Sequence, residues 1–352
     1  MSAPDEGVPS LEQWRALYAQ TARFKKITPW KWMWDSNLFG VKNPEDGETG
    51  YCCVLGAGKE VFGLAVYLGH EGLEGYWNGV NHPELAHEEG AGHIKRCLLL
   101  TFDDRGDLEG TDLEVIKNLG FEFKGVRAWP QFRSYRPGYC PWHLTAKETR
   151  FLTLVLDQAN EIVLRFKANP SLFDSPKPHH YWVRVRQGGA EHGEWSDTWQ
   201  KPVPITRVVQ ISKSFDSRRL ETIAAMPQKQ MAWEVDFFYT PAVVREKGRR
   251  PYFPMMLLFS DHESYFIFNG HFTEPGRYLV ELHEQLLQAI EKAEILPEEI
   301  LVKKEELQAY LKPLCERFGI GVSLVDDLPA IRDARGGMRE FLAGGKGPKG
   351  RR

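Results

Sequence analysis

The sequence predicts a mixed α/β protein, with an α+β N-terminal module and a C-terminal mixed sheet that has helices packed on it. Three observations support this fold class. The 352 residues exceed what one compact core usually holds. Strand-like runs alternate with amphipathic helical stretches along the chain. In the last third, three consecutive strand-like runs precede two helix–strand units, a succession typical of a sheet with antiparallel and parallel neighbours.

The N-terminal module, placed at residues 1–168, begins and ends on helices with clear start signals. Ser10 precedes an apolar stripe and is the expected N-cap of the first helix. Thr145 and Glu148 form a capping box for the last helix. Between them we predict a hairpin of strands at 51–55 and 61–68, helices at 71–80 and 112–119, and a strand at 95–102.

The middle of the chain, residues 169–231, differs in character from what precedes it. Pro170, Pro176 and Pro178 indicate a linker, and residues 181–186 alternate apolar and basic side chains as a half-buried strand does. We therefore expect a linker with a small β-rich appendage. The last residues, 343–352, are Gly-rich and basic, so a disordered tail is expected there.

Residues 232–342 carry the clearest order of elements. Strands are predicted at 233–239, 252–259 and 265–272, followed by a helix at 277–294, a strand at 300–302, a helix at 305–318 and a strand at 320–325. This succession resembles the ribonuclease-H-like fold shared by nucleases, integrases and transposases. The resemblance rests on element order, and it implies a mixed sheet with helices packed on it.

Composition limits the cellular locations and the binding partners that the sequence is compatible with. A net charge of −3 gives no general attraction for nucleic acid. No run of eighteen apolar residues predicts a membrane span, and the acidic start MSAPDEGVPS does not fit a secretory signal. The five cysteines are odd in number and lack CxxC spacing, which indicates reduced thiols. We expect a soluble, cytoplasmic protein.

A catalytic ribonuclease-H-like site needs several carboxylates around two divalent metal ions. Asp236 lies in the middle of the first predicted strand, as such a ligand would. Glu281 or Glu284 on the following helix and Asp333 near the last helix could supply others. The fourth strand, however, ends at Lys303–Lys304, where an acid is expected and where a lysine repels a cation. Asp236 is therefore either a metal ligand or an ordinary polar residue of a strand.

The segment 129–142, rich in aromatic residues and proline, is predicted to be a loop. Arginines and rings alternate in and before it: Arg127, Trp129, Arg133, Tyr135, Arg136 and Trp142. Guanidinium groups beside aromatic faces can stack on bases or bind phosphate and carboxylate groups. Alternatively, the rings attach the loop to the core while the arginines face solvent or pair with local acids.

Several short phrases stand out in both halves of the chain. They are Asp35–Val41, Gly50–Cys53, Leu64–Gly72 and Trp129–Trp142 in the N-terminal half, and Trp233–Asp236 and Arg250–Pro254 in the C-terminal half. These phrases resemble an uncharacterised bacterial family with two domains of unknown function in tandem. The resemblance spans most of the chain, with 170–230 least covered, and it implies no activity, ligand or catalytic residue.

Two classes of function follow from these observations. The favoured one is a non-enzymatic binding or adaptor protein with a degenerate ribonuclease-H-like domain, no cofactor, and a protein partner or an anionic ligand. The alternative is a metal-dependent nuclease, or another phosphoryl-transfer enzyme, that uses Mg²⁺ or Mn²⁺ and a non-standard carboxylate set around Asp236.

Overall fold

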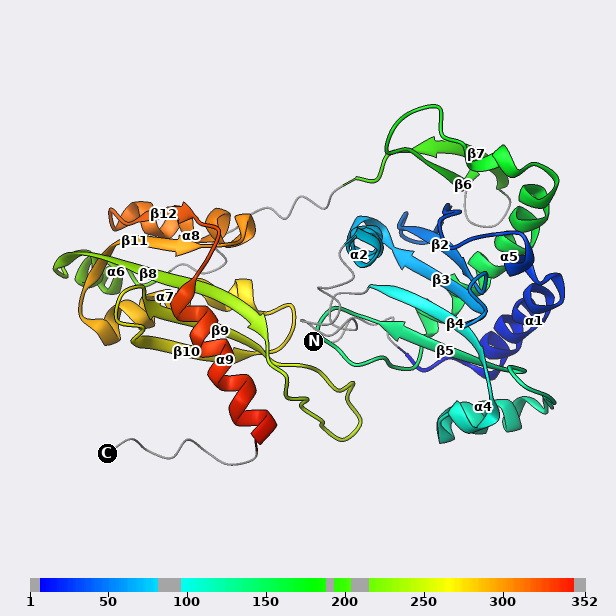
Figure 1. Cartoon of the computed structure of the whole chain (residues 1–352), viewed down its shortest axis with the longest axis horizontal. Coiled ribbons are helices and arrows are strands. Elements are labelled where there is room, and N and C mark those ends of the chain that lie inside the picture. The colour runs from blue at the N-terminus through cyan, green and yellow to red at the C-terminus, as the bar shows by residue number, and fades with distance from the viewer. Residues whose placement is uncertain (1–6, 82–95, 188–192, 204–214, 345–352) are drawn as a thin grey trace. The chain divides into compact units, whose positions relative to one another are not determined.

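The computed structural model describes residues 7–81, 96–187, 193–203 and 215–344 (Figure 1). Contacts divide the chain into two compact units, Met1–Pro137 with Pro141–Ile205 and Gly138–Cys140 with Thr206–Arg352. Each unit contains one sheet with its own core. Of the tail predicted at 343–352, the first two residues end the last helix, and the rest lie outside the described residues.

The first unit is built on a seven-stranded sheet in the order β5-β4-β3-β2-β1-β6-β7. Neighbouring strands are antiparallel except for β1 and β6, which are parallel. The strands are β1 Phe39–Lys42, β2 Thr49–Leu55, β3 Gly63–Leu68, β4 Cys97–Asp103, β5 Trp129–Tyr135, β6 Tyr181–Gln187 and β7 Glu194–Gln200.

Helices cover both faces of this sheet. The helices α1 (Leu11–Ile27) and α5 (Ala146–Ala168) pack on one face and enclose the main core, whereas α2 (Gly69–Asn81) lies on the other (Figure 1). The helix α4 (Gly110–Leu119) and the 3₁₀ turns η1 (Pro29–Lys31), η2 (Arg105–Asp107) and η3 (Pro170–Phe173) complete the unit.

The predicted helix starts are confirmed. The Ser10 side chain accepts a hydrogen bond from the Gln13 amide at 3.2 Å. The Thr145 hydroxyl accepts one from the Glu148 amide at 3.2 Å, and the Glu148 carboxylate accepts one from the Thr145 amide at 2.8 Å. These contacts satisfy amide groups that the helices themselves leave without partners.

The prediction of a loop at 129–142 is wrong for residues 129–135, which form the edge strand β5. Its proline suggested a loop, but an edge strand tolerates proline because one side of its backbone needs no partner strand. Phe132 enters the core, and its neighbours in the strand lie on the opposite face.

The structure also differs from the β-rich appendage predicted at 169–231. The strands β6 and β7 extend the first sheet. Gly40 has no side chain, so β1 can lie close to Val183 of β6, and Trp182 of β6 packs in the main core. The helix α6 (Ser217–Ala224) and the start of the next strand belong to the second unit.

The second unit contains a five-stranded sheet in the order β10-β9-β8-β11-β12. β8, β9 and β10 are antiparallel neighbours, while β11 and β12 run parallel to β8. The strands are β8 Gln228–Tyr239, β9 Met255–Asp261, β10 Ile267–Thr273, β11 Leu296–Val302 and β12 Gly321–Leu324. Three antiparallel strands followed by two parallel crossovers form the ribonuclease-H-like arrangement predicted from the element order.

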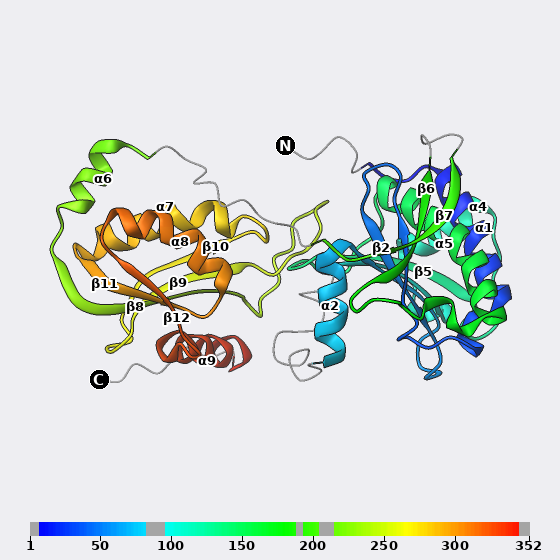
Figure 2. The ribbon, with the colours of Figure 1, turned by 90° about the horizontal axis from the view of Figure 1, so that it is seen from above.

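Two helix layers enclose this second sheet (Figure 2). α7 (Tyr278–Ala293) and α8 (Glu305–Arg317) bury one face, and α6 packs on α7. The last helix, α9 (Pro329–Gly344), covers the other face through a smaller cluster that includes Phe238 and Ile331. No helix in the described parts of either unit is both long enough and apolar enough to cross a membrane.

Candidate functional site

Asp236 lies near the end of β8, on the face of the sheet that α9 covers. Side chains alternate along this strand: Trp233 and Val235 enter the core under α7, and Glu234 accepts a hydrogen bond from the Ile331 amide of α9 at 2.9 Å. By this alternation, Asp236 shares the face of Glu234. Its side chain is buried, with 7% of its surface exposed.

The partner of Asp236 is a lysine from the segment that follows β11. Lys304 Nζ lies 2.5 Å from Asp236 Oδ1 and 2.5 Å from the Phe237 carbonyl oxygen. The same ammonium group sits 4.0 Å from the centroid of the Phe237 ring. Lys304 occupies the N-cap position of α8, two residues after the end of β11, where a catalytic site would carry an acid. The buried carboxylate is therefore paired with a fixed positive charge.

Glu281 and Glu284 are brought close to each other but not to Asp236. Both lie on α7, on the opposite side of the sheet, and both line a cavity of about 480 Å³. Glu281 Oε2 is 2.8 Å from His271 Nε2, and Glu281 Oε1 is 2.9 Å from an Arg277 nitrogen. Glu284 takes two hydrogen bonds from the guanidinium group of Arg219, at 3.0 and 3.1 Å.

These partners affect the acidity of Glu281. Burial raises its pKa, but the hydrogen bond with His271 and the positive charge of Arg277 outweigh that effect, so the pKa of Glu281 lies below its usual range. The carboxylate stays ionised because neighbouring groups stabilise the charge. The same partners occupy oxygens that a metal ion would need.

Asp333 stands apart from the other three candidates, on the exposed side of α9. The four carboxylates that could have formed a two-metal site are thus distributed over both faces of the sheet. Within the residues that the structure describes, no group of three His, Cys, Asp or Glu side chains could hold a metal ion. The residues around Asp236 do not fit a divalent cation, since the nearest charged partner is an ammonium group.

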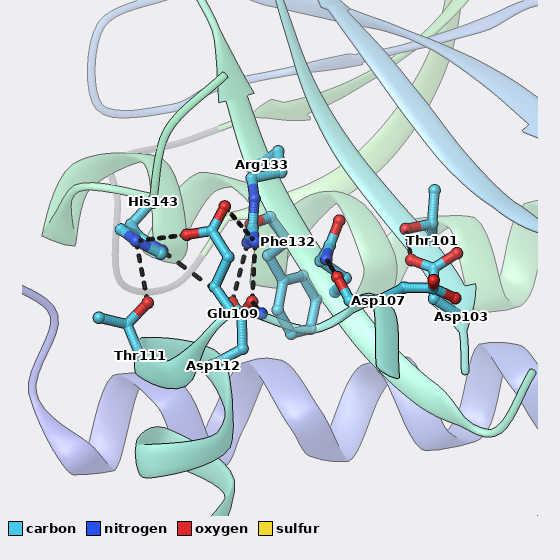
Figure 3. A network of polar contacts seen from close by, with 10 residues as sticks. Thr101, Asp103, Asp107, Glu109, Thr111, Asp112, Phe132, Arg133 and His143 are labelled. Carbon is cyan, nitrogen blue, oxygen red and sulfur yellow. Dashed lines mark hydrogen bonds and ion pairs between the residues drawn. The ribbon is translucent and has the colours of Figure 1, made fainter. Parts of the chain in front are cut away.

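In the first unit, Arg133 projects from β5 toward α4 (Figure 3). Its two terminal nitrogens donate to the two oxygens of Asp112 at 2.8 and 2.7 Å, and one of them also lies 3.3 Å from Glu109 Oε1. Glu109 in turn reaches His143, whose ring nitrogen is 3.4 Å from Glu109 Oε2 and 3.0 Å from the Thr111 hydroxyl.

The network around Arg133 joins the edge strand to the start of α4. Burial alone lowers the pKa of Arg133, but the hydrogen bonds and charge of Asp112 outweigh it, so the pKa lies above its usual range. A bidentate pair of this kind holds both side chains in one orientation. Pairing of the arginines with local acids is one of the two alternatives that the sequence leaves open, and Arg133 forms such a pair with Asp112.

The other arginines of the predicted ligand segment also have partners within their unit. An Arg136 nitrogen lies 3.1 Å from Glu148 Oε1. The Arg127 guanidinium donates to the Lys59 carbonyl at 2.8 Å and lies 5.0 Å from the centroid of the Phe62 ring. The structure therefore distributes Arg127, Arg133 and Arg136 over three separate contacts.

The aromatic residues of the segment are distributed in the same way. Trp129 packs against Phe123 at a centroid distance of 5.6 Å, with Arg105 on its ring at 5.8 Å. Tyr135 is half-buried, and 37% of Trp142 is exposed. Ligand binding by these six residues stays a prediction.

Two family models match the chain, and both describe domains of unknown function. The model DUF7309 matches residues 14–184, and the model DUF6930 matches residues 219–339. The chain carries a DUF7309 domain followed by a DUF6930 domain. The tandem arrangement predicted from the sequence phrases is thereby confirmed. The first match covers β1 to β5 and the start of β6, and the second covers all five strands of the second sheet. No curated protein matches the chain.

Among solved structures, two retroviral complexes resemble the chain weakly. The magnesium-bound integrase catalytic core domain of HTLV-2 is 14% identical, with 35% of this chain and 78% of that one covered and a TM-score of 0.23. The simian T-cell lymphotropic virus intasome in complex with the PP2A regulatory subunit B56 gamma is 12% identical, with 55% and 59% covered and a TM-score of 0.25. The strand order of the second sheet, not these weak likenesses, defines the fold of the DUF6930 domain.

Sequence reasoning missed two kinds of residue. The sequence places two lysines at the end of the fourth strand, but it does not show that Lys304 is the one that pairs with Asp236. Lys25 and Lys26, at the end of α1, are not among the residues that the sequence singles out. Neither role has a local signal in the sequence, because the partners lie far away along the chain.

Proposed function

We propose that the protein acts by binding rather than by metal-dependent catalysis, and that its DUF6930 domain is a ribonuclease-H-like domain without the metal chemistry. The observation that carries this proposal is the ion pair of Lys304 with Asp236. An ammonium group at this carboxylate supplies the positive charge that a divalent cation would supply in a nuclease. It also repels such a cation from the same place.

The remaining carboxylates support the same conclusion. Glu281 and Glu284 bind His271, Arg277 and Arg219 on the far face of the sheet. A two-metal mechanism requires its ligands to converge on ions about 4 Å apart. A domain that keeps the fold and replaces the metal by an internal ion pair is suited to a role as a binding or adaptor module.

The proposal includes a bacterial, cytoplasmic setting. Its bacterial part depends on the family resemblance of the sequence phrases. The cytoplasmic part is supported by the five cysteines, which are all free thiols, four of them buried. A reducing compartment maintains thiols in this state.

The first test is a cleavage assay with the full chain, Mg²⁺ or Mn²⁺, and labelled single-stranded DNA, duplex DNA, RNA and RNA–DNA hybrid. We expect no cleavage above a metal-free control, because the Lys304 ammonium group takes the place of a divalent cation at Asp236. Cleavage that requires metal and disappears in Asp236→Asn would establish the alternative function and refute the proposed one.

A second test measures the ion pair directly through urea unfolding. Lys304→Met is expected to lower the free energy of unfolding by about 2 kcal/mol, because it leaves a buried carboxylate unpaired. The loss stays below that of a fully buried ion pair because the Lys304 side chain is partly exposed. Adding Asp236→Asn should recover most of the loss, because the buried charge is then gone.

The matched control for this measurement is Lys303→Met, which removes an exposed lysine one position away. It should change the free energy of unfolding by less than about 0.5 kcal/mol. Equal effects of Lys303→Met and Lys304→Met would contradict the role given to the pair.

A further inference from the structure

A small pocket of the DUF7309 domain lies between α1 and the segment that leads into β5. Its cavity volume is about 340 Å³. The apolar part of the lining includes Phe102 from β4, together with Phe123 and Pro130. The last turn of α1 contributes Lys25 and Lys26, and Lys124 lines the cavity from the segment before β5. The pocket thus combines aromatic surface with three ammonium groups.

The charges in this pocket are not balanced by its own residues. Glu122 is the single acid among the lining residues, and its carboxylate lies 3.7 Å from Lys124, with both side chains more than four-fifths exposed. Among the residues that the structure describes, Lys25 and Lys26 have no carboxylate within ion-pair distance. Burial lowers the pKa of Lys25, as expected for an ammonium group that is partly desolvated without a compensating anion.

Lys25 is nevertheless held in a defined position. Its Nζ donates to the Arg127 carbonyl at 2.9 Å and lies 4.9 Å from the centroid of the Phe102 ring. An ammonium group has three N–H donors, and the Arg127 carbonyl takes one of them. The lysine is therefore oriented by the domain while it keeps donors for a further group.

The backbone at Arg127, next to the lining residue Ala128, is also constrained. Arg127 adopts a left-handed conformation with φ of 50°, which a residue with a side chain seldom adopts. Its amide donates to Asp104 Oδ1 at 2.6 Å, and its carbonyl accepts from Lys25. Strained backbone that is held by contacts on both sides is common beside binding sites.

We propose that this pocket binds a small anion with an aromatic or apolar body, through a phosphate or carboxylate group. Lys25 and Lys26 would bind the anionic oxygens, while Phe102, Phe123 and Pro130 would contact the body of the ligand. This site goes beyond the proposed function, because it belongs to the DUF7309 domain and needs nothing from Asp236 or Lys304. Its failure would leave the conclusion about the DUF6930 domain unchanged.

Other basic groups of the DUF7309 domain already have carboxylate partners. The guanidinium groups of Arg133 and Arg136 already bind the carboxylates of Asp112 and Glu148. An incoming anion would have to displace those carboxylates. At Lys25 and Lys26, in contrast, an anion would provide the missing partner, and at Lys25 it would also reduce the cost of burying a positive charge.

The experiment is isothermal titration calorimetry of the full chain with phenyl phosphate, benzoate, inorganic phosphate and phenol. Phenyl phosphate or benzoate should bind at least about ten-fold more tightly than inorganic phosphate or phenol, because only the former two engage both lysines and rings. The tighter of the two identifies the anionic group. If neither exceeds inorganic phosphate, the proposal is overturned.

Variants then locate the binding. Lys25→Gln should weaken the better of the two ligands by about ten-fold or more, through loss of a charge-assisted hydrogen bond. The matched control is Lys117→Gln, which removes a lysine from the last turn of α4, outside the pocket. If Lys25 and Lys117 only compensate the partial negative charge at the ends of their helices, both variants will leave ligand affinity unchanged, and the proposal fails.

A third variant tests the cavity without touching the lysines. Ala22 is exposed on α1 and lines the pocket, so Ala22→Phe should fill the cavity while the helix remains folded. We expect loss of binding with an unchanged circular dichroism spectrum. Full affinity in Ala22→Phe would mean that the anion binds elsewhere on the surface and would overturn the assignment.

Discussion

Charged residues of this protein differ in how their charge is compensated. Arg133 and Lys304 each bind a buried or nearly buried carboxylate, so their charges stabilise the fold. Lys25 has a backbone carbonyl and an aromatic ring as partners, and burial lowers its pKa. A basic residue without a carboxylate partner remains available for an external anion, whereas a paired one does not.

Glu281 gives a prediction about pH. Because its pKa is lower in the folded protein than in the unfolded chain, ionised Glu281 stabilises the fold above the unfolded pKa of about 4.3. This stabilisation is lost as the pH falls through the folded pKa. Glu281→Gln should therefore lower the free energy of unfolding by about 1 kcal/mol at neutral pH and by little near pH 2.

Urea unfolding of Glu281→Gln at several pH values measures this difference. The control is Glu298→Gln, which removes an exposed carboxylate of β11 in the same domain. An identical pH dependence in both variants would show that the contacts with His271 and Arg277 do not stabilise Glu281.

Strands and helices of the two domains show which sequence features serve packing. The edge strand β5 contains Pro130 and is attached to α4 by Arg133 and Asp112. In the middle of the same sheet, β3 and β4 approach so closely that Gly63 has no space for a side chain. A Cβ atom there would lie 1.9 Å from the Leu100 carbonyl oxygen. The absence of a side chain at this position allows the two strands to pair.

Gly63→Ala is accordingly expected to destabilise the DUF7309 domain by about 2–3 kcal/mol, because the strands must move apart to accommodate the methyl group. Urea unfolding followed by circular dichroism measures the change. Gly106→Ala is the control, since a Cβ atom at Gly106 meets nothing within 4 Å. Equal stability of the two variants would contradict the close approach of β3 and β4.

Among the residues that the structure describes, each of the two domains has a main hydrophobic core of its own. Leu152 of α5 lies in the main core of the DUF7309 domain, and Leu286 of α7 lies in that of the DUF6930 domain; both are fully buried. Because the two clusters share no residue, each domain has its own source of cooperative stability.

This separation predicts two unfolding transitions in calorimetry of the full chain. Leu152→Ala should destabilise the DUF7309 transition by about 3 kcal/mol through loss of buried apolar contacts, and Leu286→Ala should do the same to the DUF6930 transition. Each variant serves as the control for the other. A single transition that both variants shift equally would show that the domains unfold as one unit.

Local signals in the sequence suffice for much of the secondary structure and for the tandem organisation. Ser10 and the Thr145–Glu148 capping box act within one helical turn, so their pattern identifies the helix starts without knowledge of the fold. The three strands and two helix–strand units of the DUF6930 domain also keep their order in the structure. Where local composition misled, as at β5 and at 169–231, pairing with a distant strand decided the conformation.

The candidate sites depended on tertiary structure to a much greater degree. A lysine at the end of the fourth strand is visible in the sequence, but only the fold brings its ammonium group to Asp236, 68 residues earlier in the chain. Likewise, only packing brings the end of α1 to Phe102 and Arg127 and creates the pocket around Lys25. Charge pairing depends on distances in space, and these are not determined by spacing along the chain.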